Sequence, residues 1–241
     1  MQNYCKTIGA LAAASALVAG TASAEVEYEI HTGYTTEYIW RGIDLGDNLA
    51  EVGVDAATTY NDISLSAGVW ATAFDAPGTA DDIDSEVDFY AEAGYDAGFA
   101  NLAVGYIYYW NMGSLGTDNQ EIYFQASRDF GFATASLTYF WDVCSSGAAG
   151  NNNGYTELAL SRGWELNQCV TLNVSSALGI MTEGWECSHW VTKATLDWGF
   201  AENAKLSPFV GFSLALGEDK GSPWDQTDNE LFGGCMLAVG F

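Results

Sequence analysis

Carboxylate side chains recur at alternate positions in several stretches of the chain, and their spacing is the first feature that suggests chemistry. In the stretch SEVDFYAEAGYD, Glu86, Asp88 and Glu92 share one parity, and small or apolar side chains hold the other. Successive side chains of an extended strand point to opposite faces, so the three carboxylates lie on one face. Such a face attracts cations and repels anions. The sequence therefore predicts a strand surface that binds cations or passes them along.

The same face continues through other segments, and it carries two basic side chains among many acidic ones. Because so few basic groups are present, water or mobile cations must solvate most of the carboxylates. We expect this face to line a hydrated lumen that prefers cations; the alternative is that the charges only solvate a narrow interior. The candidate lumen residues are Glu37, Arg41, Glu51, Asp55, Glu86, Asp88, Glu92, Glu121, Glu157, Lys193 and Asp197.

Arg41 opens the stretch RGIDLGDN (41–48), whose glycines and aspartates are typical of a long connection. An arginine on the acidic face at this point has two interpretations. It either forms part of a constriction that contacts solutes, or it ties the connection to the wall of the fold.

The charge of the whole chain limits its partners. Its 241 residues include 32 acidic and 7 basic ones, which gives a formal net charge of −25. Such a chain repels nucleic acid and other polyanions, so we expect no nucleic-acid partner. We also expect no cofactor.

The first 24 residues have the layout of a secretory signal peptide. A short polar head with Lys6 is followed by an apolar run and then by Ala22, Ser23 and Ala24, small residues typical of a cleavage site. We therefore expect residues 1–24 to be removed on export, and residues 25–241 to form a single domain.

After residue 24 the apolar pattern has a period of two and is interrupted by turn residues, which predicts strands rather than helices. Short connections alternate along the chain with long polar ones, an arrangement typical of outer-membrane barrels. We predict an all-β fold: an antiparallel transmembrane β-barrel of about 12 strands, within roughly 10–14, with short periplasmic turns and long extracellular loops. The expected short connections are 60–63, 96–101, 128–132, 164–168 and 201–205, and the long ones are 41–48, 75–84, 111–119, 144–153, 183–189 and 218–229.

Aromatic residues on the apolar parity gather near both ends of the expected strands, as in the belts of membrane barrels at the two bilayer interfaces. The terminal strand ends on Phe241, which resembles the signal read by the barrel-assembly machinery, so we expect that machinery and outer-membrane lipid as partners. The expected belt residues are Trp40, Trp110, Trp141 and Trp190 near long loops, and Tyr28, Tyr60, Tyr95, Trp164 and Trp198 near short turns.

Four cysteines remain after residue 24, without the Cys-x-x-Cys spacing of a zinc site. Export permits disulfides. Cys144 and Cys187 belong to two successive expected external loops, so a disulfide between them is possible. Cys169 and Cys235 are expected on strands, as small apolar residues rather than as a pair.

Catalysis and metal binding are the alternatives to passage. Only His31 and His189 could serve as a histidine base, and adjacent residues of a strand point in opposite directions, so we expect no enzyme. The acidic connection DAPGTADDID could offer calcium ligands, but it lacks the ordered spacing of an EF-hand, and a solvated charge run is the preferred interpretation. Its candidate ligands are Asp75, Asp81, Asp82 and Asp84.

The stretches YTTEYIWRGIDLGDN, SAGVWAT, SEVDFYAEAGYDAG and LAVGYIYYW together resemble the TorF-type porin family, also called the Gcw_chp family. The resemblance implies an exported barrel in the outer membrane of a diderm bacterium, assigned as a porin by its architecture. It implies no catalytic residues. We therefore expect a channel for passive diffusion of small solutes or cations. The alternative is a non-conducting barrel with a structural, adhesion or surface-recognition role through its loops, and a soluble β-sandwich is the third interpretation.

Overall fold

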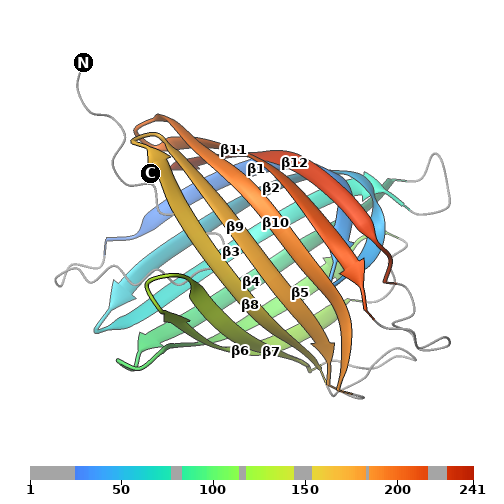
Figure 1. The fold of residues 1–241 in the computed structure, drawn as a ribbon, viewed down its shortest axis with the longest axis horizontal. Helices are drawn as coiled ribbons and strands as arrows, with labels where there is room; N and C mark the ends of the chain where they lie inside the picture. Colours follow the sequence, from blue (N-terminus) through green and yellow to red (C-terminus); the bar gives the residue numbers. More distant parts are fainter. Residues whose placement is uncertain (1–24, 77–82, 114–117, 144–153, 183–184, 217–226) are drawn as a thin grey trace.

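A computed structural model describes residues 25–76, 83–113, 118–143, 154–182, 185–216 and 227–241, and almost all of them lie in strands. Twelve strands follow one another along the chain (Figure 1). They are β1 (Glu27–Trp40), β2 (Ile43–Tyr60), β3 (Ile63–Asp75), β4 (Ile83–Asp96), β5 (Asn101–Asn111), β6 (Asn119–Asp129), β7 (Thr134–Asp142), β8 (Tyr155–Asn167), β9 (Val170–Met181), β10 (Glu186–Ala201), β11 (Ala204–Ala215) and β12 (Glu230–Gly240).

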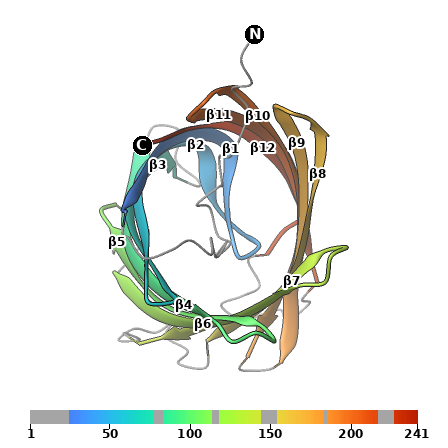
Figure 2. The same cartoon turned by 90° about the vertical axis from the view of Figure 1, so that its left-hand side faces the viewer.

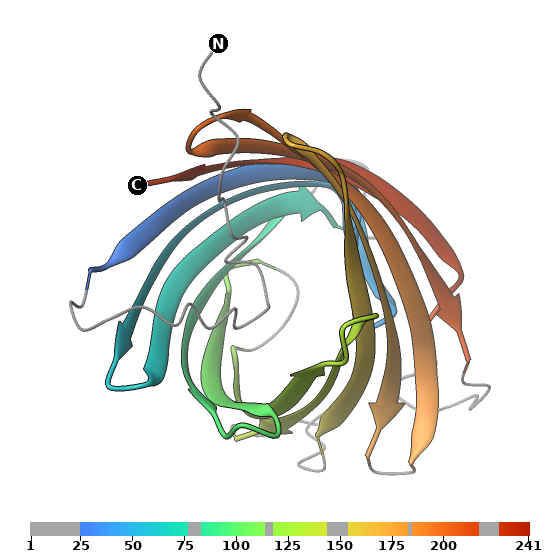
Figure 3. The same cartoon turned by 60° about the vertical axis from the view of Figure 1, so that its left-hand side comes forward.

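The strands form a closed antiparallel barrel, which confirms the predicted fold. Each strand pairs with its neighbours in the sequence, and β1 also pairs with β12, from Glu29 opposite Gly240 to Thr35 opposite Gly234. The ring is visible from two directions (Figures 2 and 3). Closure leaves no long free sheet edge, because the first and last strands satisfy each other's backbone groups. No helix of the described residues is long and apolar enough to cross a membrane.

The two faces of the barrel wall differ as the period-two pattern predicts. Large apolar side chains such as Val54, Phe89 and Leu158 are exposed on the outer surface. Carboxylates at the alternate positions, such as Glu86 and Glu121, are buried inside. An apolar exterior around a polar interior is the reverse of a soluble β-sandwich, in which the apolar faces pack against each other.

Connection lengths alternate around the barrel with two exceptions. At one end, next to the C-terminus, the turns between strands span 61–62, 97–100, 130–133, 168–169 and 202–203. At the other end the connections 76–82, 112–118, 143–154 and 216–229 are longer, but 182–185 is only as long as 97–100. The predicted long connection over 183–189 is wrong, because β10 already begins at Glu186. β1 and β2 are joined by only Arg41 and Gly42. The prediction of a long loop over 41–48 is therefore wrong, because β2 begins at Ile43 and pairs with Trp40.

The end of this β1–β2 hairpin turns into the barrel (Figure 2). Pairing of β1 with β12 ends at Thr35, and regular pairing of β2 with β3 begins only at Ala50, beyond an irregular pair at Asp47. Residues 36–48, which we call the inner hairpin, therefore pair mainly with each other. A register shift between Glu37 and Ile39 marks the point where the hairpin leaves the wall. Bulges of this kind bend strands and re-aim their side chains.

The cysteines differ from expectation. Cys187 carries a free thiol, so the predicted disulfide with Cys144, which lies outside the described residues, is not formed. Cys169 lies in the turn between β8 and β9 and is disulfide-bonded, so it is not an apolar strand residue. Cys235 lies on β12 with a free thiol.

Candidate functional site

The carboxylates of the lumen are held mainly by aromatic donors rather than by basic side chains. Tyr90 Oη donates to Asp55 at 2.5 Å, and this bond joins β4 to β2 across the inner face of β3. Tyr123 Oη similarly joins β6 to Glu92 on β4 at 2.7 Å. Sequence reasoning missed these pairs, although the alternation of tyrosine and carboxylate at the same parity is a usable signal. Further pairs are Trp70 with Glu51, Tyr109 with Glu121, Tyr155 with Glu157 and Asn173 with Asp197.

Among the residues that the structure describes, three lysine or arginine side chains lie inside the barrel rather than the two expected. Lys193 on β10 points its Nζ at the ring of Phe209, 5.3 Å from the centroid. Lys205 on β11 is buried near the C-terminal end of the barrel, and it was not among the expected lumen residues. Arg41 reaches the opposite wall from the inner hairpin.

Glu86, Asp88 and Glu92 on β4 have no basic partner within the described residues. Glu86 is buried and receives a long hydrogen bond of 3.4 Å from Tyr38 Oη. Asp88 lies two positions further along the same inner face, and its Oδ1 is buried without a hydrogen-bond partner. Carboxylates this close in a shielded site favour a shared proton or a bound cation. Together with Glu92 they form an acidic ladder along one side of the lumen.

The guanidinium of Arg41 is the central contact of the inner hairpin. Nη1 and Nη2 each donate to one oxygen of Glu121 on β6, both at 2.7 Å, in a bidentate pair. The side chains of Arg41 and Glu121 are only 13% and 4% exposed. The guanidinium carbon also lies 4.4 Å from the ring centre of Trp40 and 4.5 Å from those of Phe140 and Tyr155. A desolvated cation over aromatic faces is attracted to each of them.

Gly42 completes the tip of the hairpin. Arg41 and Gly42 both have positive φ, 52° and 81°, the backbone pattern of a type I′ hairpin turn. A Cβ on Gly42 would lie 2.6 Å from His189 on β10, so only glycine lets the turn approach this wall. His189 is 2% exposed and stacks on Tyr155 at 6.1 Å. The tip is therefore wedged between β6 and β10.

A small aromatic cluster packs the other side of the hairpin. The ring of Tyr38 lies 5.1 Å from that of Phe74 and 5.9 Å from that of Trp70, both on β3. Phe74 is 1% exposed. The inner hairpin thus has a packed core of its own inside the barrel, and it narrows the lumen between β3 and β10.

Replacing Phe74 with alanine is expected to loosen the inner hairpin while the barrel stays closed. Truncating a buried phenylalanine costs about 3–5 kcal/mol, and here the lost contacts include those with Tyr38. Amide hydrogen exchange over residues 36–48 should accelerate, and exchange in β9 should not change. Phe89→Ala, which removes an exposed outer ring, is the control. Equal exchange in the hairpin of Phe74→Ala and the unmodified protein would contradict this prediction.

At the longer-loop end of the barrel the inner hairpin is acidic. Glu37 interacts with Glu230 of β12, and Asp44 and Asp47 lie close to both. Ile43 forms an isolated bridge with Thr227 beside this group. Neighbouring carboxylates repel each other when both are ionised. The acidic side of the hairpin therefore disfavours the position inside the barrel that the pair of Arg41 and Glu121 favours.

Eight of the nine expected belt aromatics are exposed and lie near the ends of their strands. Trp40 is the exception, because its ring lies inside, 6.3 Å from that of Tyr109. Beyond Thr35 the hairpin leaves β12 and folds into the barrel, so Tyr38 and Trp40 lie inside it although they keep the strand parity of the exposed Tyr34. The other eight are Trp110, Trp141, Trp190, Tyr28, Tyr60, Tyr95, Trp164 and Trp198.

The two histidines have different polar partners. Ser188 Oγ lies 3.0 Å from Nδ1 of its neighbour His189, and both residues are buried. His31 Nε2 lies 3.1 Å from Asp55 Oδ2 inside the barrel.

The structure describes only two of the four candidate calcium ligands. Asp81 and Asp82 lie outside the described residues, Asp84 is buried at the start of β4, and Asp75 accepts a hydrogen bond from Asn48. The described residues contain no group of three or more acidic, histidine or cysteine side chains that could hold a metal ion.

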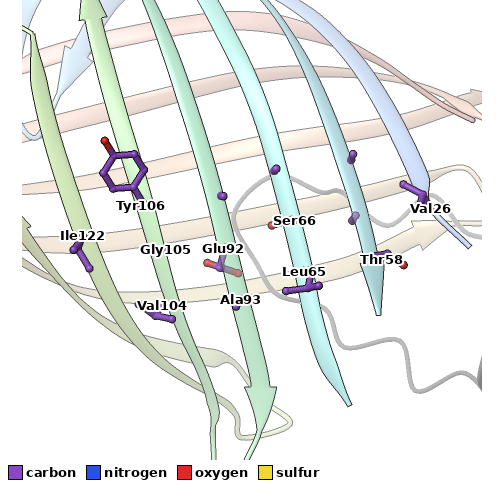
Figure 4. A pocket seen from close by; sticks show the side chains of 14 residues that line it. Val26, Thr58, Leu65, Ser66, Glu92, Ala93, Val104, Gly105, Tyr106 and Ile122 are labelled. Atoms are coloured by element: carbon purple, nitrogen blue, oxygen red, sulfur yellow. The ribbon is translucent and has the colours of Figure 1, made fainter. Parts of the chain in front are cut away.

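A shallow apolar hollow of about 610 Å³ crosses the barrel wall from β1 to β6 (Figure 4). Small side chains form much of it, and Ala67 and Ala91 face each other across β3 and β4. These alanines share the parity of Val69 and Phe89, which are exposed on the outer surface. The hollow therefore belongs mainly to the exterior and is separate from the lumen.

Comparison with known proteins places the chain in a family. Residues 19–206 match the family described as "Bacterial protein of unknown function (Gcw_chp)", and the chain belongs to that family. The match extends past the first half of the chain, to which the clearest sequence resemblances are confined. The sequence matches no curated protein.

Solved structures of outer-membrane channels have the same fold. The "COG4313 outer membrane channel from Pseudomonas putida F1" superposes with a TM-score of 0.55 over 92% of this chain and 97% of that one, at 9% identity. The NanC porin gives 0.54 over 88% and 98%, at 8% identity. The KdgM porin gives 0.53 over 89% and 99%, at 9% identity. At such low identity the likeness establishes the fold alone.

Proposed function

We propose that this protein is a porin-like channel of the bacterial outer membrane, through which small solutes diffuse passively and cations pass in preference to anions. The observation that carries the proposal is a closed barrel whose outer surface is apolar and whose lumen is lined with carboxylates such as Glu86 and Glu92. The membrane then solvates the outside, and water and cations solvate the inside. The shared fold of several outer-membrane channels supports this function.

The charge of the lumen favours a different solute class from that of one structural neighbour. The KdgM porin was solved in complex with oligogalacturonate, a carboxylate-bearing oligosaccharide. Here Asp88 and Glu92 have no basic partner within the described residues and would repel such an anion. Small cations and neutral solutes are the class that this lumen admits.

Export and assembly follow the same proposal. Residues 1–24 act as a cleaved signal peptide, and residues 25–241 form the mature barrel. Phe241 pairs its backbone with Tyr28 of β1, which places the terminal residue at the closing seam of the barrel. The assembly machinery would recognise this terminal strand before closure. In this proposal the chain is a TorF-type member of its family.

Planar-bilayer recording tests the function directly. The refolded mature protein is expected to give discrete current steps, and a salt gradient should give a reversal potential of the sign set by cation flow. A reversal potential that indicates anion preference would contradict the role of the lumen carboxylates.

The inner hairpin favours a second candidate function. Because Arg41 and Gly42 both pack against the wall formed by β6–β10, a permanently seated hairpin would suit a non-conducting barrel that acts through its loops. A folded protein that gives no current steps over a wide range of voltage would support that function and reject the channel.

A further inference from the structure

The residues that contact Arg41 belong to two groups, one in the inner hairpin itself and one in the barrel wall. Trp40 is its neighbour in the inner hairpin. Glu121, Phe140 and Tyr155 come from β6, β7 and β8, and they would remain in place if the hairpin were elsewhere. We call these three residues the wall cage.

The wall cage has the chemistry of a receptor for an organic cation. A carboxylate that meets two parallel N–H donors matches the planar fork of a guanidinium, whereas an ammonium group cannot make this bidentate contact. The two aromatic faces attract any cation placed over them. Tyr109 Oη donates to Glu121 at 2.9 Å and so fixes the orientation of the carboxylate.

We propose that the wall cage is a binding site for guanidinium-bearing organic cations that enter the lumen, and that Arg41 occupies it as an internal ligand. The proposal deepens the proposed function, because it names a solute class for the same lumen. Glu121, Phe140 and Tyr155 bind the cation, and Arg41 competes with it. An entering ligand that displaces Arg41 also removes the main attraction holding the inner hairpin across the lumen.

Two features of the hairpin allow an entering cation to replace Arg41 in the wall cage. Its residues pair mainly with each other, so withdrawal of Arg41 breaks few hydrogen bonds to the wall. Its acidic side chains Glu37, Asp44 and Asp47 lie toward the mouth, where they concentrate cations before they reach the cage. An internal ligand competes through its high effective concentration, so the site binds an external cation weakly until Arg41 is removed.

Chemical rescue provides the test. Arg41→Ala removes the side chain beyond Cβ, and the missing fragment is the size of ethylguanidinium. Isothermal titration calorimetry on the full mature protein in detergent should show that Arg41→Ala binds ethylguanidinium at least about tenfold more tightly than the unmodified protein. Ethylammonium should bind Arg41→Ala more weakly than ethylguanidinium does.

The partner residue gives the decisive control. In the Arg41→Ala background, Glu121→Gln is expected to weaken ethylguanidinium binding by roughly tenfold or more. Glu165→Gln makes the same charge change on an exposed residue near the short-turn end of β8 and should leave the affinity unchanged. Circular dichroism verifies that each variant retains its strands. Removing both members of a buried pair is also milder than removing one, so the double variant is expected to fold.

The outcomes separate this proposal from the channel itself. Equal affinity of Arg41→Ala and the unmodified protein, or an affinity that does not depend on Glu121, would reject the cage as a cation site. Calorimetry measures binding at equilibrium and needs no current. A silent bilayer recording would therefore reject the channel without affecting the result for the cage.

Discussion

Arg41→Ala is expected to raise the mean conductance of the refolded protein severalfold. The substitution removes the bidentate pair with Glu121 and the contacts with Phe140 and Tyr155, which together hold the inner hairpin across the lumen. Loss of one partner of a buried ion pair costs about 3–5 kcal/mol, because it leaves the other charge uncompensated. If the hairpin leaves the lumen, water can enter and solvate the unpaired Glu121, which lowers that cost.

The size of the effect follows from the population of the seated hairpin. A loss of about 3 kcal/mol shifts the equilibrium between seated and withdrawn hairpin by about a hundredfold. The repulsion between Glu37 and Glu230 at the mouth acts in the same direction once Arg41 is gone. Longer open times, larger current steps, or both should therefore appear in single-channel records.

Arg128→Ala is the matched control for this experiment. Arg128 lies near the short-turn end of β6, where its guanidinium is 5.5 Å from the ring of Phe130 and is exposed, outside the lumen. Its removal changes the net charge by the same amount and should leave the conductance unaltered. If Arg41→Ala folds and conducts like the unmodified protein, Arg41 does not restrict the passage.

The second large effect is expected from the combined substitution Glu86→Gln, Asp88→Asn and Glu92→Gln. These side chains form the acidic ladder of β4, and no basic group within the described residues contacts them. Rings and rows of carboxylates select cations by raising their local concentration. Neutralising the ladder should move the reversal potential in a salt gradient most of the way toward zero and lower the conductance to cations.

Salt dependence makes this prediction more specific. The field of the ladder extends over a Debye length of about 10 Å at 0.1 M salt and about 3 Å at 1 M. The difference in selectivity between the variant and the unmodified protein should therefore be largest in dilute salt. A variant with Asp62→Asn, Glu165→Gln and Glu202→Gln, three exposed residues at the short-turn end, removes the same charge there. Equal reversal potentials for both triple variants would assign the selectivity to the overall charge instead of the ladder.

The strand order and the two faces of the wall could be predicted because they depend on local spacing. Side chains alternate at every residue of a strand, so Glu86 and Phe89 must lie on opposite faces wherever the strand is placed. Turn residues such as Asn61 and Asp62 mark where strands end, and both adopt positive φ in the structure. If each strand pairs with its neighbours in the sequence, only the pairing of the first strand with the last is needed to close the barrel.

The inner hairpin could not be predicted in this way. The glycines and aspartates of residues 41–48 are typical of a loop, but β2 begins at Ile43, and only Arg41 and Gly42 form a turn, because the hairpin packs inside the barrel. The hairpin leaves β12 after Thr35, which brings Tyr38 and Trp40 inside the barrel without a change of strand parity, so the alternation of side chains does not reveal it. The sequence left open whether Arg41 forms a constriction or ties a connection to the wall.

The sequence by itself determined the number of strands, the apolar exterior and the acidic interior, since each depends on residues that are neighbours in the chain. The tertiary structure alone decided which donor holds each carboxylate and what occupies the lumen. Arg41 and Glu121 are separated by 80 residues, and their pairing exists only because ring closure places β6 across from the β1–β2 hairpin. Contacts across a lumen join residues far apart in the chain, so no local spacing in the sequence predicts the pair of Arg41 and Glu121.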